Sequence, residues 1–106
     1  MITVKHIDAS ETYLLRQKIL RPNQSLKNCK YLSDYEIDSF HLGAFLNDKL
    51  ISIASFSKEL YPDLQTGIHY RLRGMATLPN FRNQRAGTSL IRKAEQILQE
   101  RGASTL

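Results

Sequence analysis

One stretch near the C-terminal end of the sequence, residues 71–98, constrains the fold more than any other. It reads RLRGMATLPNFRNQRAGTSLIRKAEQIL. Apolar and polar residues alternate over residues 68–73, which is typical of a strand. From Ala86 onward apolar residues recur at helical spacing until Gly102, a natural helix terminator. The stretch therefore predicts a strand, a short basic turn and a long helix in immediate succession.

The junction between the turn and the helix has the chemistry of an anion-binding site. The first amides of a helix have no partner within it, and their dipoles point outward toward an approaching anion. Small residues let the backbone come close to a ligand, and Ala86, Gly87 and Thr88 stand at this junction. We expect a phosphate or similar group to bind there.

Charge is concentrated in the same stretch. The 106-residue chain has a net charge of +5, and residues 70–94 contain six Arg and Lys residues and no Asp or Glu. Such a field favours an anionic ligand, which could be a phosphorylated cofactor, a nucleic acid or an acidic partner. A solvated basic face is the alternative. Nucleic acid ranks last, because the stretch has few aromatic residues beyond Tyr70 and Phe81.

The rest of the chain predicts strands and one further helix around this unit. A strand is expected at residues 2–7, then a helix capped near Asp8, Ser10 and Glu11 and ended by Pro22. Residues 23–39 are expected to form a loop with a helical turn. Residues 40–56 predict an antiparallel hairpin that turns at residues 47–49, and residues 59–67 a loop. Gly74 would mark a bulge in the next strand.

These elements predict a single domain over residues 1–106 of the α/β (α+β) class, with a mixed, mainly antiparallel sheet flanked by helices. The charged N-terminal segment lacks the apolar run of a signal peptide or membrane span, so we expect a cytoplasmic protein. Cys29 is the single cysteine and is expected to be inert packing. No metal site is expected, because His6, His41 and His69 lack metal-ligand spacing.

The basic turn resembles the pyrophosphate-binding signature of the GCN5-related N-acetyltransferase (GNAT) family. That signature is Arg or Gln, two residues, Gly, one residue, then Gly or Ala, and five of the six positions fit in residues 82–87. The preceding RLRGMATLP is similar to the family's bulged fourth strand. The order of elements matches the first two thirds of its fold, and ILRPNQ and FHLGAF look like bacterial members.

The resemblance implies a set of cofactor-binding residues. Backbone groups of Met75, Ala76 and Thr77 would pair with the pantetheine arm of acetyl coenzyme A. The backbone amides that would hold its pyrophosphate belong to Arg82, Asn83, Gln84, Arg85, Ala86, Gly87 and Thr88. Arg85 departs from the pattern, because the family usually has glycine there. Its side chain could crowd the phosphates or add a charged contact, and a positive φ at this residue would strain the loop.

The resemblance also implies transfer of an acetyl group from acetyl coenzyme A to a primary amine, without a covalent enzyme intermediate. A carboxylate or a water chain would be the base, and Glu59, Asp34, Glu36 and Asp38 are the carboxylates considered. The family's usual acid, a tyrosine after the fifth strand, is absent. We therefore expect a C-terminally incomplete fold, from truncation, from a sequence limited to ordered residues, or from completion by another chain, with the first two favoured.

An incomplete fold leaves a second class of function open. The chain could be a non-catalytic module for coenzyme A binding or for association, and Arg85 favours that alternative. Strand four would present an unpaired edge, which is a known route to homo-oligomers. No membrane partner is expected.

Overall fold

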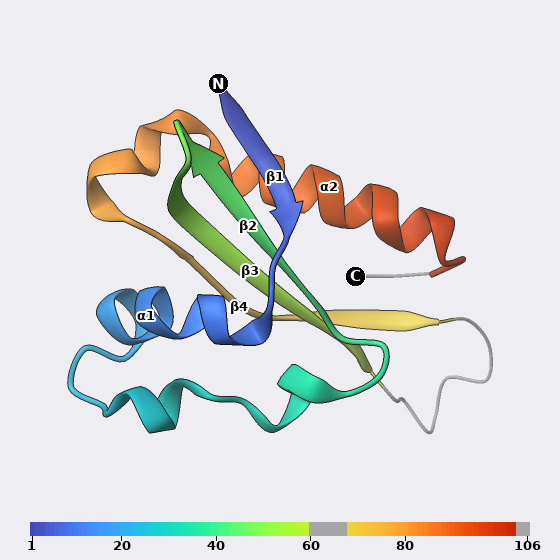
Figure 1. Ribbon diagram of the computed structural model, residues 1–106. Coiled ribbons are helices and arrows are strands. Elements are labelled where there is room, and N and C mark those ends of the chain that lie inside the picture. The colour runs from blue at the N-terminus through green and yellow to red at the C-terminus, as the bar shows by residue number, and fades with distance from the viewer. Residues whose placement is uncertain (60–67, 104–106) are drawn as a thin grey trace.

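The computed structural model describes residues 1–59 and 68–103 (Figure 1). The predicted loop at residues 59–67 lies outside the described residues except for Glu59. The strands are β1 (Ile2–His6), β2 (Phe40–Leu46), β3 (Lys49–Glu59) and β4 (His69–Thr77). The α-helices are α1 (Tyr13–Leu15) and α2 (Ala86–Glu100). A π-helical turn continues α1 (Arg16–Leu20), and 3-10 turns occupy Ala9–Thr12, Leu26–Cys29, Leu32–Tyr35 and Pro79–Gln84.

The four strands form one sheet in the order β1-β2-β3-β4, and each pair of neighbours is antiparallel. The predicted hairpin turn lies between β2 and β3. Asn47 and Asp48 both have positive φ there, 51° and 68°, which matches the right-handed twist of the flanking strands. The predicted class, a mainly antiparallel sheet flanked by helices, is confirmed.

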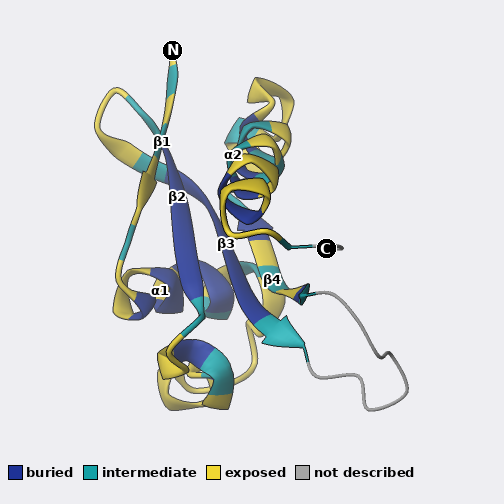
Figure 2. Cartoon of the chain, turned by 90° about the vertical axis from the view of Figure 1, so that its right-hand side faces the viewer, coloured by how far each residue is buried: buried dark blue, intermediate teal, exposed yellow. Residues whose placement is uncertain are grey.

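The sheet lies between two helical layers (Figures 1 and 2). On one face, α2 packs its apolar stripe against the strands and contributes Leu90, Ala94, Ile97 and Leu98 to the main core. On the other face, the N-terminal helical segment forms a smaller core, whose buried members are Leu15, Ile53 and Ala76. The sheet is buried on both sides along β2 and β3 (Figure 2).

The N-terminal helical segment begins where the capping pattern predicts. Asp8 accepts a hydrogen bond from the Ser10 amide at 3.0 Å, and Glu11 accepts one from the Asp8 amide at 2.7 Å. The segment ends at Leu20, two residues before Pro22. It is less regular than predicted, because 3-10, α and π turns follow one another within it.

Strand β4 carries the predicted bulge. Ser55 pairs with Gly74 and Phe56 pairs with Leu72, so Arg73 is an extra residue on β4. Gly74 is also a point of close approach, because a Cβ there would lie 3.3 Å from the ring of Tyr31. The bulge therefore touches the loop between α1 and β2.

Candidate functional site

The turn into α2 forces Arg85 into a left-handed conformation, with φ 60° and ψ 25°. This region favours glycine, and a residue with a side chain held there stores about 1 to 3 kcal/mol of strain. The sequence analysis expects strain in the loop if residue 85 has a positive φ, and residue 85 does have one. Strained positions persist where the surrounding structure holds them, and they gather at ligand-binding turns.

The amides that follow Arg85 have no hydrogen-bond acceptor among residues 1–59 and 68–103. Arg85 is the N-cap residue of α2 and makes no side-chain capping hydrogen bond. The first hydrogen bond back to the cap comes from the Ser89 amide, which donates to the Arg85 carbonyl at 3.0 Å. The N–H groups of Ala86, Gly87 and Thr88 precede it and have no acceptor within the helix. These donors can receive an anion.

Two exposed arginines precede these amides in the turn. Arg82 and Arg85 are exposed, as are Asn83 and Gln84 between them. Within residues 1–59 and 68–103, neither arginine forms a salt bridge, whereas Arg16, Arg71 and Arg73 all do. The turn therefore carries uncompensated positive charge toward solvent.

A cleft of about 480 Å³ joins this turn to β4. It is lined by Met75, Gly87, Thr88, Ile91, Arg92 and Glu95. A Cβ on Gly87 would lie 3.7 Å from the Met75 methyl group, so strand and helix approach closely at this point. The structure thus brings the predicted residue Met75 together with Gly87 and Thr88.

The other predicted strand residues serve the core as well. Ala76 is buried in the smaller core, and Thr77 Oγ1 lies 2.7 Å from Ser52 Oγ. Their side chains point into the molecule, so only their backbone groups remain for a ligand. Among the described strands β4 is an edge, with β3 on one side only.

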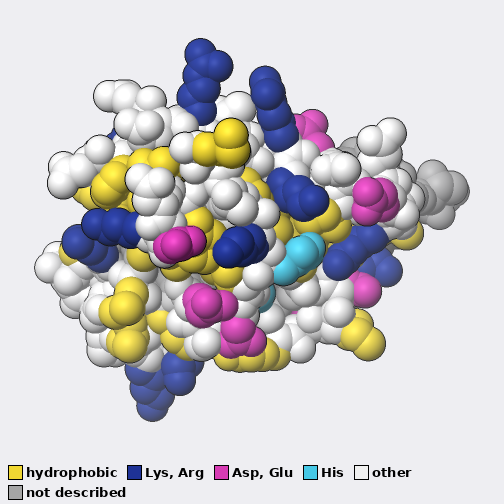
Figure 3. Space-filling view, turned by 45° about the horizontal axis from the view of Figure 1, so that its top comes forward, with side chains coloured by type: hydrophobic (Ala, Val, Ile, Leu, Met, Phe, Trp, Pro, Cys, Tyr) yellow, Lys and Arg dark blue, Asp and Glu magenta, His cyan; other side chains and the backbone are white. Residues whose placement is uncertain are grey.

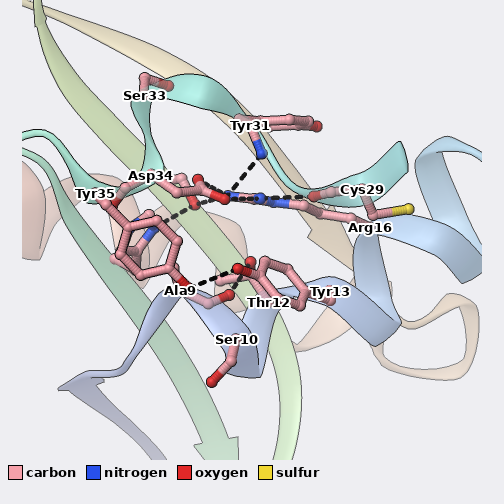
Figure 4. Close-up of polar contacts among 12 residues, drawn as sticks. Ala9, Ser10, Thr12, Tyr13, Arg16, Cys29, Tyr31, Ser33, Asp34 and Tyr35 are labelled. Carbon is pink, nitrogen blue, oxygen red and sulfur yellow. Dashed lines mark hydrogen bonds and ion pairs between the residues drawn. The ribbon is translucent and has the colours of Figure 1, made fainter. Parts of the chain in front are cut away.

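A buried cluster around Arg16 was not anticipated from the sequence (Figure 4). Arg16 is fully buried and donates two hydrogen bonds to the Asp34 carboxylate, at 2.8 and 2.9 Å. Its guanidinium also donates to the Cys29 carbonyl at 2.8 Å and to Ser55 Oγ at 2.6 Å. The Tyr31 ring stacks on the guanidinium at 3.9 Å. The cluster ties the loop before β2 to the sheet.

His41 extends this cluster. Ser55 Oγ accepts from Arg16, so its own proton is free to go to His41 Nδ1, 2.8 Å away. His41 Nε2 then donates to the Asp34 carbonyl at 3.0 Å. Because a carbonyl oxygen can only accept, His41 Nε2 carries the hydrogen of this contact. The spacing of Arg16, Asp34 and His41 in the sequence gives no local signal of this contact.

The carboxylates considered as bases have separate surroundings. Asp34 is committed to Arg16, and Asp38 lies 3.9 Å from Lys58 on the surface. Glu59 accepts from Arg73 at 2.9 Å. Glu36 is exposed and lines a hollow beside the β4 bulge. Of the four, Glu36 is thus the one that lines this hollow.

The remaining polar groups do not form a metal site within the described residues. Cys29 is fully buried with its thiol 3.7 Å from the Ser25 carbonyl, which is the position of a packing residue. His6 is exposed, and its pKa is lowered by partial burial and by the charges of Arg101 and Lys93. Acidic and basic side chains intermingle on the face shown in Figure 3, unlike a continuous basic surface for nucleic acid.

Comparison with known proteins identifies the family. The model of the acetyltransferase (GNAT) family matches residues 7–106. A curated relative from Bacillus subtilis (strain 168), an uncharacterized N-acetyltransferase called YitI, is 50% identical over 106 residues, covering 100% of this chain and 71% of the relative. The chain therefore belongs to the GNAT family of acetyltransferases.

Solved structures agree on the fold. A ribosomal-protein-alanine N-acetyltransferase from Brucella melitensis biovar Abortus 2308 superposes with a TM-score of 0.75 at 16% identity, covering 100% of this chain and 77% of that one. An aminoglycoside acetyltransferase, AAC(6')-Iy, in complex with the bisubstrate analogue CoA-S-monomethyl-acetylneamine has a TM-score of 0.77 at 14% identity, covering 99% and 76%. In the described part of the chain no helix is long and apolar enough to span a membrane.

Proposed function

We propose that this protein is an acetyl coenzyme A-dependent N-acetyltransferase that acts on a primary amine, and that residues 1–106 form one domain in the cytoplasm. The observation that carries the proposal is the uncapped start of α2. There the free amides of Ala86, Gly87 and Thr88 lie beside unpaired arginines and next to a cleft against β4. The family membership and the coenzyme A analogue bound to a structural relative support the same donor.

The chain fits the two parts of such a donor. The amides of residues 82–88 and the exposed Arg82 and Arg85 suit a pyrophosphate, because charged donors bind phosphate oxygens with short, strong hydrogen bonds. The edge of β4 at Met75, Ala76 and Thr77 offers backbone groups to the amides of a pantetheine arm. The apolar side chains of Met75 and Ile91 line the cleft and suit the methylene groups of the pantetheine arm.

Bound acetyl coenzyme A would supply an acetyl thioester for direct attack by the amine. In that reaction a bond forms between the amine nitrogen and the acetyl carbon, and the carbon–sulfur bond breaks. The nitrogen loses a proton, and the departing thiolate gains one. This chain's own contribution is to hold both partners at the bulge, which converts a bimolecular step into one between neighbours.

The alternative is a non-catalytic module that binds coenzyme A or associates through the β4 edge. The specific observation that favours it is the strained Arg85 in place of the family's usual glycine. A side chain at this position narrows the approach to the amides of α2. The two proposals differ in turnover but share the binding site.

Calorimetric titration with acetyl coenzyme A tests the site. Arg82→Ala is expected to weaken binding about tenfold, which is the worth of one charge-assisted contact to phosphate. Lys18→Ala is the matched control, since Lys18 is an exposed cation on the segment that covers the opposite face of the sheet. Equal affinity of wild type and Arg82→Ala for acetyl coenzyme A would contradict the proposed pyrophosphate site in this turn. Binding without acetyl transfer to any of a panel of amines would favour the non-catalytic module.

A further inference from the structure

An open hollow of about 570 Å³ lies beside the β4 bulge, on the side of the sheet away from α2. Arg73, the extra residue of the bulge, lines it together with Arg21 and the loop between α1 and β2. A second hollow of about 470 Å³ shares Arg21 and Tyr31 with the first. Tyr31 thus forms a wall between the two spaces, with its ring against Gly74.

Positive charge dominates this hollow. Its charged lining residues are Arg21, Lys30, Arg73 and a single carboxylate, Glu36. Two other carboxylates lie nearby and are paired with arginines, and the pairing with Glu59 offsets part of the charge of Arg73, so Arg21 and Lys30 are the unpaired cations of the hollow. Asp34 is buried against Arg16, and Glu59 lies between Arg73 at 2.9 Å and Arg71 at 3.9 Å.

The cations of the hollow retain free donors. Arg21 and Lys30 are exposed and form no salt bridge with any described residue, and each charged group lies near an aromatic ring. The Arg21 guanidinium lies 5.9 Å from the Tyr31 ring, and the Lys30 ammonium lies 5.7 Å from the Tyr13 ring. Arg73 donates through Nε to Ser57 and through Nη2 to Glu59. Among the described residues its Nη1 group has no hydrogen-bond partner, which leaves it for a ligand.

We propose that this hollow binds amines that also carry an anionic group, a carboxylate or a phosphate, and that such amines are the acetyl acceptors. This inference rests on the proposed function, which places the pantetheine arm along Met75, Ala76 and Thr77 and holds both reactants at the bulge beside Arg73. The anionic group would be held by Arg21, Lys30 and Arg73, so that the amine is directed toward the bulge. A polycationic amine is disfavoured, because it would meet like charges at short range.

Matched pairs of small amines test the charge requirement directly. The ¹⁵N-labelled chain would be titrated with β-alanine against propylamine, and with O-phosphoethanolamine against ethanolamine, and followed by amide chemical shifts. We expect the anionic member of each pair to shift the amides of Lys30, Tyr31 and Arg73. Equal shifts from the partner that lacks the anionic group, or shifts confined to Gly87 and Thr88, would overturn the inference.

Charge reversal identifies the residues responsible. Arg21→Glu and Lys30→Glu are each expected to weaken binding of O-phosphoethanolamine about fivefold, the typical worth of one partly exposed charge pair. Lys18→Glu is the control with the same charge change, because Lys18 is exposed and does not line this hollow. An equal loss in the control would show a general field effect and would overturn the assignment to these residues.

Separate readouts distinguish failure of this inference from failure of the proposed function. Acetyl transfer to propylamine at the same kcat/KM as to β-alanine would overturn the charge requirement and leave the acetyltransferase intact. Absence of acetyl coenzyme A binding, with anion-dependent shifts at Tyr31 and Arg73 preserved, would remove the proposed reaction and leave the hollow as a binding site.

Discussion

Arginine is used in two opposite ways on the two sides of the sheet. Arg16 is fully buried, and its guanidinium is held by Asp34, Ser55 and the Cys29 carbonyl. Arg85 is exposed, has a strained backbone, and forms no ion pair with a described residue. The first site is closed by the protein's own atoms, whereas the second leaves its charge and the following amides open.

The difference separates a structural charge from a binding charge. Taking a charge out of water is costly, so buried Arg16 depends on its carboxylate, hydroxyl and carbonyl partners. Its two Nη groups have these partners, whereas its buried Nε has none among the described residues. A solvent-exposed arginine with no partner costs little in the free protein and can form its contacts when an anion arrives. Residue type and net charge alone do not make this distinction.

Breaking the closed site should have the largest effect. Asp34→Ala leaves the Arg16 guanidinium buried without its carboxylate, and we expect the free energy of unfolding to fall by about 3 to 5 kcal/mol. Urea denaturation followed by circular dichroism measures this. The double variant Arg16→Met with Asp34→Ala is expected to lose less than the sum of the two single variants, because no charge is then left unpaired. Additive losses would contradict the closed-site description.

At the open site, the stability of the free protein should depend on backbone strain at residue 85 rather than on the charge of its side chain. Arg85→Gly is expected to be more stable than Arg85→Ala by about 1 kcal/mol, because glycine adopts positive φ without steric cost. Both variants remove the same guanidinium, so their difference isolates the backbone. Thermal unfolding of the pair measures it. Equal stability would mean that residue 85 is not held in the left-handed region.

The smallest effect concerns Tyr13 at the margin of the closed site. Burial, the hydrogen bond to Tyr35 and nearby negative charge raise the pKa of Tyr13 to about 12. In the unfolded chain its pKa is about 10. The folded form then keeps a proton that the unfolded form loses, so stability should fall as pH rises from about 10 to 12.

Tyr13→Phe tests this assignment, since it removes the titrating group while keeping the ring. The variant also loses the hydrogen bond to Tyr35, so its unfolding midpoint should lie lower than that of wild type below about pH 10, and it should lose part of the decline of that midpoint at alkaline pH. An identical decline in both proteins would assign the effect to other groups.

Local sequence patterns predict much of the fold but little of the buried cluster around Arg16. The alternation before Gly74, the Asp8 cap and the turn at Asn47 and Asp48 are short-range signals, and the structure confirms each of them. The sequence makes strain at Arg85 conditional on a positive φ, and the structure supplies that condition. These features depend on neighbours in the chain.

The Arg16 cluster depends on contacts far apart in sequence. Arg16 and Ser55 are separated by 39 residues, and nothing in the intervening composition indicates that they meet. Asp34 is one of the carboxylates that the sequence offers as a base, yet in the structure it is the partner of Arg16. The hollow beside the bulge was equally inaccessible, because its lining comes from three separate segments.

The bulge at Arg73 also exchanges the two sides of one strand. Tyr70 faces the core under α2 and Ala76 faces the opposite core, although their separation of six positions would put both on one side of a regular strand. A one-residue deletion at Arg73 would restore regular alternation and exchange the sides of every position beyond it. The number of residues in β4 therefore matters more than the identity of the side chain at the bulge. Position 73 should tolerate substitutions far better than insertions or deletions.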